Sequence, residues 1–396
     1  MRATIALVLF TCTAVCLVAA APIPASRGYP QAEALPPEDL TKAVDQLGAV
    51  DYAARTDAAR KLRRGPAAQV VPALIAAAKG HKNGYVRYRA LVLLTGFNDT
   101  RTKDLMVAML SDPNDRLREA GYEYVEHNPD PKLVGLLLDA LGKEGAEFVR
   151  PALLRALAAH GADPRVRNAL VPEIARGITM FRSALIEALG DYHADYALTP
   201  LMEAVQLEGP LQVDAAIALG KIGDRRALAA LSAAQRAAPR EAQPQIAAGI
   251  CLLGVNCSSH LGYIDKSLRF AAKNSEFQPL LRSAVAAAGA LADGGHPEAA
   301  DLLFDVGIPS QDPARAPIAL ALGAVALRAT PLMLSVIEKR ADREPAVLLL
   351  RDAFDMLEEP YEKERFFVAV RRAYWQLTEG SESRKVAQIL IEKLEF

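Results

Sequence analysis

Five arginines recur along the first half of the chain at a spacing that suits anion binding by a row of guanidinium groups. We call them the arginine row; they are Arg55, Arg87, Arg118, Arg150 and Arg182. The intervals between them are 32, 31, 32 and 32 residues. A guanidinium presents a planar fork of donors that fits a carboxylate or a phosphate. The alternative is structural, because ion pairs between repeats could be formed with acids such as Asp51, Asp115 and Glu147. Arg87 and Arg182 lack an obvious acid nearby in the sequence, which favours these two for binding.

Three histidines also recur, and each is followed closely by an aspartate. The pairs are His127 with Asp130, His160 with Asp163, and His193 with Asp195. A histidine beside a carboxylate could serve as a base or as a metal ligand. Equivalent positions of stacked helices lie about 8–10 Å apart, however, whereas zinc–nitrogen distances are about 2.0–2.1 Å. We therefore expect a repeated turn in which the histidine ends one helix and the aspartate caps the next.

Cys251 and Cys257 are the only cysteines outside the N-terminal apolar segment. A zinc site would need a fourth ligand and closer cysteine spacing. A reactive thiol would need electropositive surroundings, which the neighbouring leucines do not provide. A disulfide suits an exported chain in an oxidising compartment. We expect a Cys251–Cys257 disulfide and no metal site.

The N-terminus has the pattern of an export signal. Arg2 is followed by an apolar run from Ala3 to Ala21, and Val18-Ala19-Ala20 supplies the small residues that a signal peptidase requires. We predict a signal peptide over residues 1–20 and a periplasmic, envelope or secreted location, with no membrane span after cleavage. The alternative is an uncleaved anchor, because the run is nearly long enough to cross a bilayer. A proline-rich linker is predicted over residues 21–37.

The sequence contains none of the short motifs that mark the common catalytic sites. G-x-S-x-G, H-E-x-x-H, the phosphate-binding loop and the Rossmann glycine pattern are all missing. The G-x-x-G of residues 220–223 has no strand before it, so we interpret its glycines as helix-packing and helix-ending elements. We predict no catalytic residue, no cofactor and no enzymatic activity.

Helices must position the residues described above, because apolar side chains recur at i, i+3, i+4 and i+7 between short turns. Val213–Leu231 is the clearest example. In this stretch an apolar helix ends at Gly223, Asp224 caps the next helix, and Leu228 and Leu231 begin the next apolar face. Looser copies follow one another roughly every thirty residues, and none can bury its apolar face alone.

This stretch and the arginine spacing resemble the HEAT-like repeat, especially the variety first described in phycobilisome lyases. The resemblance covers residues from about 50 to about 360 and implies an all-α, right-handed α-solenoid superhelix of about ten helical hairpins. It also implies that the second helices line the concave face, and that an early arginine in each forms a ladder with neighbouring acids. We predict a solenoid over residues 38–360 and C-terminal capping helices over residues 361–396, where aromatic residues gather.

The surface chemistry leads to a prediction of function. A formal net charge of −1 gives no global attraction for nucleic acid or an anionic membrane. Tyrosine and arginine together are frequent anchors of protein interfaces. We predict a non-catalytic scaffold that binds a protein partner on the concave face of its N-terminal repeats through Arg87, Tyr88, Arg118, Tyr122, Arg150 and Arg182. The alternatives are a cofactor-handling, lyase-like enzyme, which the resemblance to bilin lyases implies, and polyanion or nucleic-acid binding along the arginine row.

Overall fold

The computed structural model describes residues 34–396, and every regular element in this range is helical. The signal peptide predicted for residues 1–20 lies outside the described residues, as does most of the linker predicted for residues 21–37. The first helix starts at Pro37, one residue before the predicted solenoid. The end of the predicted linker already packs, because the Leu35 N–H donates to Gln69 Oε1 at 3.0 Å.

The 22 α-helices of the described residues follow one another as pairs, which confirms the predicted all-α solenoid. The first helices of the pairs are α1 (Pro37–Gln46), α3 (Ala67–Gly80), α5 (Arg101–Met109), α7 (Val134–Leu141), α9 (Pro164–Glu173), α11 (Leu198–Ala204), α13 (Leu228–Ala237), α15 (Cys257–Lys273), α17 (Pro297–Gly307), α19 (Thr330–Lys339) and α21 (Pro360–Gln376). The second helices are α2 (Tyr52–Arg64), α4 (Gly84–Thr95), α6 (Asp115–His127), α8 (Val149–Ala159), α10 (Thr179–Asp191), α12 (Pro210–Ile222), α14 (Gln243–Leu252), α16 (Gln278–Asp293), α18 (Arg315–Arg328), α20 (Arg343–Met356) and α22 (Glu382–Lys393). Within residues 34–396, no single helix has the length and apolar character to cross a membrane. Helices α18 and α19 have that length and composition only when taken together, and the pair is bent by 119°.

The turn between α12 and α13 forms as its sequence predicts. Gly223 ends α12 with a φ of +80°, a left-handed conformation that a residue without Cβ adopts readily. Asp224 then accepts a hydrogen bond from the Arg226 N–H at 2.9 Å and starts the next helical segment. Asp130 and Asp163 accept the same bond from the residue two positions later. The turn chemistry is therefore shared by several repeats.

Small residues allow the second helices in the middle of the array to pack very closely. A Cβ added at Gly220 would collide with the backbone of Gly249, and one added at Gly249 would collide with the backbone of Ala216. Gly190 meets Ala218 in the same way. These contacts confirm that Gly220 serves helix packing rather than a nucleotide site.

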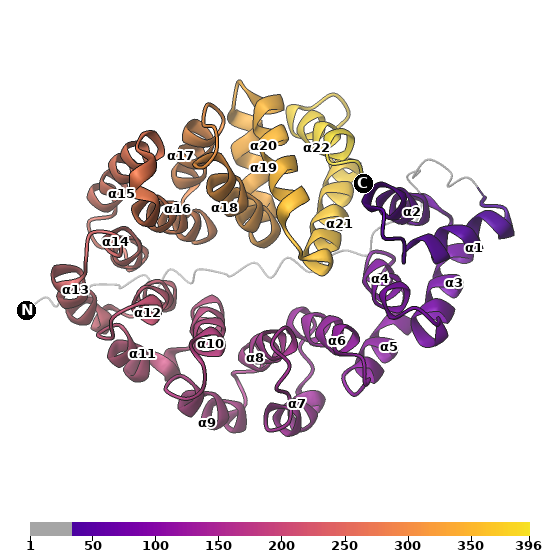
Figure 1. Cartoon of the computed structure of the whole chain (residues 1–396), viewed down its shortest axis with the longest axis horizontal. Helices are drawn as coiled ribbons and strands as arrows, with labels where there is room; N and C mark the ends of the chain where they lie inside the picture. Colours follow the sequence, from indigo (N-terminus) through magenta and orange to yellow (C-terminus); the bar gives the residue numbers. More distant parts are fainter. Residues whose placement is uncertain (1–33) are drawn as a thin grey trace, which may run out of the picture.

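The array closes on itself into an elongated ring, as Figure 1 shows, with α21, α22 and the C-terminus beside α2 and α4. Ion pairs join the two ends: Arg63 Nε lies 2.6 Å from Glu364, and Arg60 Nη2 lies 2.7 Å from Glu395. The aromatic residues predicted to cap the array pack here, with the rings of Phe367 and Phe396 stacked at 4.2 Å. The last two helices thus contact both ends of the array, which the sequence did not indicate.

Candidate functional site

Each arginine of the row donates to backbone carbonyls near the end of the preceding first helix. Arg87 Nε donates to Ala78 O at 3.1 Å, Arg150 Nη1 to Leu141 O at 2.9 Å, and Arg182 Nε to Ile174 O at 2.8 Å. Arg55 and Arg118 bind carbonyls of the turn itself. The last carbonyls of a helix have no partner within that helix. The row therefore caps the first helix in three repeats and binds the turn that follows it in the other two.

Three of these arginines also bind an acid of the following repeat. The pairs are Arg87 with Asp112 at 2.6 Å, Arg118 with Glu144 at 2.7 Å, and Arg150 with Glu173 at 2.8 Å. The hydrogen bond to Glu144 raises the pKa of Arg118. Burial acts to raise the pKa of Glu144, but the hydrogen bonds from Arg118 and the Ala146 N–H, together with the charge of Arg118, outweigh it and the pKa is lowered. The row therefore joins one repeat to the next.

The expectation that Arg87 lacks an acidic partner is wrong, because Asp112 is supplied by the next repeat. Arg182 fits that expectation, since it pairs with no carboxylate among residues 34–396. Gln212, which replaces arginine in the sixth copy, donates from Nε2 to Val205 O at 3.1 Å. Arg315 restores the complete pattern, with bonds to Gly307 O and to Asp352. The carbonyl cap is thus kept where the carboxylate pair is absent.

Tyr88 and Tyr122, predicted to contact a partner, lie in the core instead. Their exposed fractions are 4% and 1%. Burial raises the pKa of the Tyr122 hydroxyl to about 12. The apolar faces of α4 and α6 are broader than the sequence pattern suggested, so these rings fill the space between helices. The predicted site of Arg87, Tyr88, Arg118, Tyr122, Arg150 and Arg182 is therefore not an accessible surface as a whole.

The histidines lie at or just beyond the ends of their helices, as expected, and do not share one site. Asp130 and Asp163 cap the next helical segment as predicted, but Asp195 does not, because it lies inside the segment and accepts no capping hydrogen bond. His160 caps α8: its Nδ1 lies 2.7 Å from Ala156 O, and its Nε2 accepts the Asp130 N–H at 3.0 Å. His193 binds Lys221 O through Nδ1. His127 Nε2 lies 2.6 Å from Glu362, on the opposite side of the ring. Each histidine has its own backbone or carboxylate partner.

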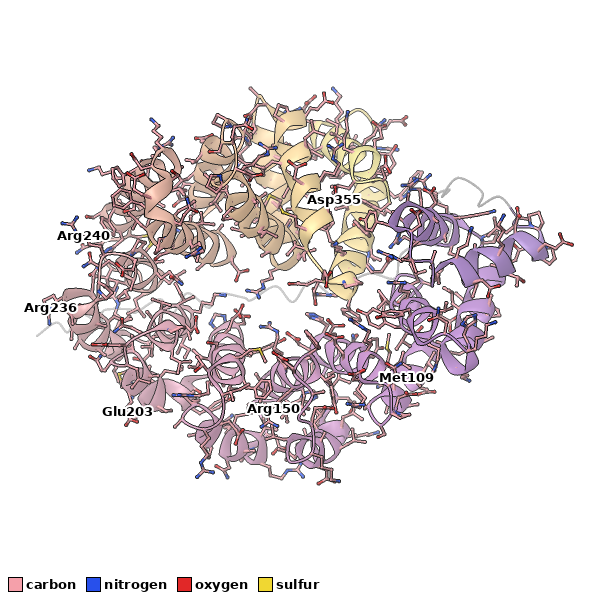
Figure 2. The ribbon with its side chains drawn as sticks, in the orientation of Figure 1. Met109, Arg150, Glu203, Arg236, Arg240 and Asp355 are labelled. Atoms are coloured by element: carbon pink, nitrogen blue, oxygen red, sulfur yellow. A yellow bond between two sulfur atoms is a disulfide. The ribbon has the colours of Figure 1, made fainter. Side chains whose placement is uncertain are left out.

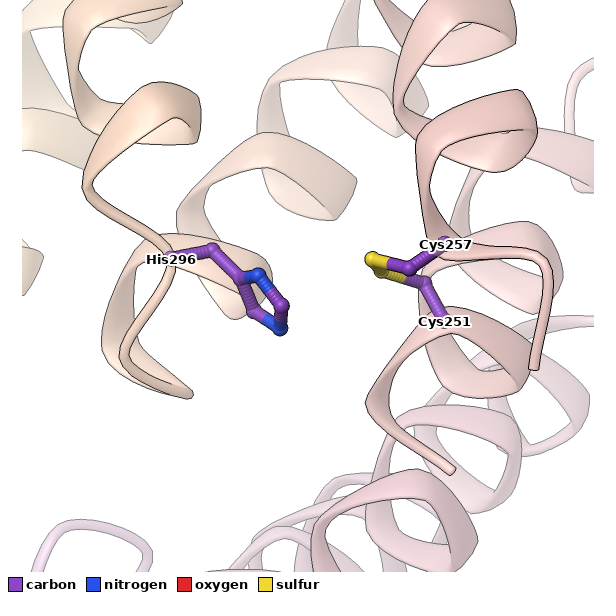
Figure 3. A group of neighbouring side chains, drawn as sticks. All are labelled: Cys251, Cys257 and His296. Atoms are coloured by element: carbon purple, nitrogen blue, oxygen red, sulfur yellow. A yellow bond between two sulfur atoms is a disulfide. The ribbon is translucent and has the colours of Figure 1, made fainter. Parts of the chain in front are cut away.

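Cys251 and Cys257 are joined by a disulfide at the junction of α14 and α15, as predicted. Figure 3 shows the ring of His296 facing the two sulfur atoms. The ligand atoms of these three residues lie within 4.8 Å of one another. Two sulfurs and one imidazole are ligand types of a soft metal ion, but structural zinc takes four ligands and requires thiolates. The disulfide form provides neither, so these three side chains do not make up a zinc site of this kind.

A second set of charged side chains gathers where opposite sides of the ring approach each other. We call it the central charge cluster, and its members are Glu126, Arg155, Glu187, Asp191, Lys221, Asp293 and Arg328. Arg155 bridges Glu126 at 2.9 Å and Asp191 at 3.0 Å. Lys221 bridges Asp191 and Asp293, the latter at 2.6 Å. Arg328 of α18 reaches Glu187 of α10 across the ring. In Figure 2, where Arg150 and Asp355 mark the two sides, side chains project into the middle from both.

Burial and charge compete within this cluster. Burial acts to raise the pKa of Asp191, but Lys221, Arg328 and Arg155 outweigh it and lower the pKa. Burial raises the pKa of the Tyr192 hydroxyl, which also donates to Glu126 at 3.0 Å. Perturbed groups collect at active sites and also in structural ion-pair networks. Here each acid has a cationic partner, which indicates a network that holds the ring closed.

One edge of the N-terminal repeats exposes large apolar side chains. We call it the turn edge, because every member lies within three residues of the start of a second helix. Its members, with exposed fractions from 38% to 97%, are Val50, Tyr52, Tyr85, Phe148, Ile178, Met180 and Leu207. Reasoning from the sequence missed this row, although its signal was present: a bulky apolar residue repeatedly occupies the turn just before the arginine row.

A family model matches part of this array of helices. Residues 71–158 match the family described as HEAT repeats. Similar solved structures include YibA of Escherichia coli, with 18% identity, a TM-score of 0.40, and coverage of 54% of this chain and 81% of that one. The complex of CpcE and CpcF of phycocyanin lyase from Nostoc sp. PCC7120 has 24% identity, a TM-score of 0.34, and coverage of 57% and 90%. Human deoxyhypusine hydroxylase in complex with glycerol has 21% identity, a TM-score of 0.29, and coverage of 56% and 86%.

No curated protein matches the chain. The family match spans α4 to α7 in full and parts of α3 and α8. Outside the matched range the same paired helices continue, and Arg182 and Arg315 form the same carbonyl caps. Residues 71–158 are thus HEAT repeats, and the rest of the described chain continues as an all-α solenoid of paired helices.

Proposed function

We propose that this chain is an exported, non-catalytic scaffold that binds a protein partner through the turn edge of its N-terminal repeats. The observation that supports this proposal is the row of exposed apolar side chains from Val50 to Leu207. Apolar surface gains about 25 cal/mol for each Å² removed from water. Exposed apolar rows bordered by polar residues are typical of interaction surfaces.

The turn edge also has the residue types that anchor interfaces. The Arg89 and Arg116 guanidinium carbons lie 5.3 Å and 5.6 Å from the centre of the exposed Tyr85 ring. Arg55 lies 5.2 Å from the ring centre of Tyr52 in the same way. Cation–π contacts of this kind hold aromatic side chains in place before a partner arrives. Tyr52 and Tyr85 are the aromatic anchors of the proposed interface.

The proposed surface differs from the concave face expected from the sequence. The concave face of the second helices looks toward the middle of the ring, where Arg328 and Glu187 already join the two sides. The donors of the arginine row are used by carbonyls and acids of the chain itself. A partner therefore binds the edge of the ring. The arginine row does not contact it but holds the turns in place through hydrogen bonds to their carbonyls.

Export and the lack of catalysis belong to the same proposal. Export rests on the apolar N-terminal segment with small residues before Ala21. The mass of the mature protein, measured after expression with its own N-terminus, should correspond to a chain that starts at Ala21. A mature protein that retains residues 1–20 would instead support the anchored alternative.

A triple variant tests the partner surface. We expect Tyr85→Asp, Phe148→Asp and Ile178→Asp together to abolish capture of specific partners from an envelope extract, because each adds a charge to the buried part of the interface. The matched control is Leu136→Asp, Phe270→Asp and Met356→Asp, which alters exposed apolar residues outside the turn edge. Circular dichroism should show both variants folded. Equal capture by the two variants would exclude the turn edge as the site.

A further inference from the structure

The closure of the ring creates a pocket that neither end of the array could form alone. Its volume is about 180 Å³. One side comes from α2 and α4, and the other from α20, α21 and residues 394–396. We call it the seam pocket. Its apolar wall is formed by Val92, Leu93, Phe354 and Phe367.

Cations outnumber acids in the lining of the seam pocket. Five basic side chains line it, namely Arg55, Arg63, Arg89, Arg351 and Lys363. The acids are Asp355 and Glu395. Glu395 already binds Arg60 at 2.7 Å, and Asp355 accepts the Tyr52 hydroxyl at 3.5 Å. The pocket therefore has an excess of positive charge.

Most of these cations have no carboxylate partner. Arg63 pairs with Glu364. Among residues 34–396, no acid forms an ion pair with Arg55, Arg89, Arg351 or Lys363. Arg55, Arg89 and Lys363 contact backbone oxygens or rings instead. Arg89 donates to Leu47 O at 2.5 Å, and Lys363 donates to Phe354 O. Carbonyl oxygens satisfy hydrogen bonds but do not neutralise a positive charge.

Burial makes this arrangement unfavourable while the pocket holds no anion. Burial, and then the nearby Arg55, lower the pKa of Arg89. Burial also lowers the pKa of Lys363, more than the carboxylates of Asp355, Glu359 and Glu358 raise it. A charge taken out of water is stable only when it is paired. Cations kept in this position next to an apolar wall fit a ligand that supplies the missing negative charge.

We propose that the seam pocket binds a small organic anion with an apolar body, of the arylalkyl or short acyl carboxylate class. The carboxylate would face Arg89 and Lys363, and the apolar body would lie against Val92, Phe354 and Phe367. An engineered apolar cavity of about 150 Å³ binds benzene, so the volume of 180 Å³ suits a ligand of one ring or a short chain. Since both ends of the array form the walls, the ligand stabilises the closed ring by mass action.

Phenylacetate is a suitable probe, and calorimetric titration of the full chain measures its binding. We expect saturable binding with one site, at least ten-fold weaker binding of the neutral 2-phenylacetamide, and similarly weak binding of inorganic phosphate, which has no apolar body. Arg89→Met and Lys363→Met keep the aliphatic stems but remove the charges, so each should weaken phenylacetate binding at least ten-fold. The matched control is Arg226→Met, because Arg226 is exposed and pairs only with Asp224 in a distant turn.

Several results would overturn the proposal. These are the absence of saturable phenylacetate binding to the folded wild-type chain, equal binding of phenylacetate and 2-phenylacetamide, and an equal loss in Arg226→Met. Arg89 also donates a hydrogen bond to Leu47 O, so circular dichroism must show that the Arg89→Met variant folds. Arg351→Glu provides an independent test, since Arg351 lies exposed at the rim, and we expect it to weaken binding several-fold. The triple variant of the turn edge should bind phenylacetate normally, which separates this proposal from the proposed partner surface.

Discussion

The arginine row and the central charge cluster both lie on second helices, but they act over different ranges. An arginine of the row binds the turn of its own repeat and an acid of the next one, as Arg118 does with Asp112 O and Glu144. The cluster also joins neighbouring repeats, but some of its members bind residues of repeats farther along the chain, as Arg328 does with Glu187 and Lys221 with Asp293. The row determines how neighbouring repeats stack. The cluster also links repeats that are not neighbours, including one pair across the ring.

The largest expected effect comes from breaking the cluster at Lys221. Its side chain is 10% exposed and lies between Asp191 and Asp293. Lys221→Met leaves two partly buried carboxylates without this cation, which should lower the free energy of unfolding by about 3 kcal/mol. Urea denaturation followed by circular dichroism measures the change.

Lys103→Met is the matched control for Lys221→Met. Lys103 is exposed and pairs with Asp130 in a turn, so its loss should cost less than about 1 kcal/mol. If both variants lose the same stability, the cluster does not hold the ring closed.

Substitutions in the arginine row should lower the free energy of unfolding by less, and by an amount that depends on which arginine is replaced. Arg118→Gln keeps a donor for the turn but deprives Glu144, which is 6% exposed, of its charged partner. We expect a loss of about 2 kcal/mol. Arg182→Gln should cost less than about 0.5 kcal/mol, because Arg182 binds only Ile174 O and Gln212 makes the same cap in the next repeat. Denaturation midpoints of the two variants check this order, and a larger loss in Arg182→Gln would contradict it.

Periodicity explains why the row could be predicted from the sequence and the cluster could not. The row occupies the same position in successive repeats, and local rules for Gly223 and Asp224 placed the turns correctly. The cluster has no fixed residue type at a repeated position, and its contacts depend on curvature accumulated over the whole array. Only charged residues in the last turns of second helices, such as Asp191, Lys221 and Asp293, hinted at it.

The predicted partner site failed in part for a related reason. Tyr88 follows Arg87 directly, and Tyr122 lies four residues after Arg118, so both rings were placed beside the row. The side of a helix that faces the neighbouring repeat cannot be distinguished from an exposed side when the apolar stripe is broad. The rings that are exposed, Tyr52 and Tyr85, occupy the turns instead.

Glu123, an acid near Glu126 but outside the central charge cluster, gives an effect that depends on pH. Its Oε2 is buried without a hydrogen-bond partner among residues 34–396. Burial, followed by the charges of Glu119 and Glu362, raises the pKa of Glu123 well above its usual range. An acid whose pKa is raised on folding binds its proton more tightly in the folded state. It therefore destabilises the fold progressively as the pH rises from its unfolded pKa of about 4.5 toward the folded value.

Glu123→Gln should remove this pH dependence. The variant and the wild type should have similar melting temperatures near pH 4, and the variant should become the more stable of the two as the pH increases toward 8. The paired Asp191 acts in the opposite direction, since its lowered pKa stabilises the fold above pH 3.8 and that stabilisation disappears on acidification. This second effect is common to both proteins and cancels in their difference. Glu203→Gln, at an exposed position, serves as the control and should run parallel to the wild type at every pH. If the melting temperature of Glu123→Gln also runs parallel to that of the wild type at every pH, Glu123 ionises normally. Its carboxyl group is then as well solvated as one on the exposed surface.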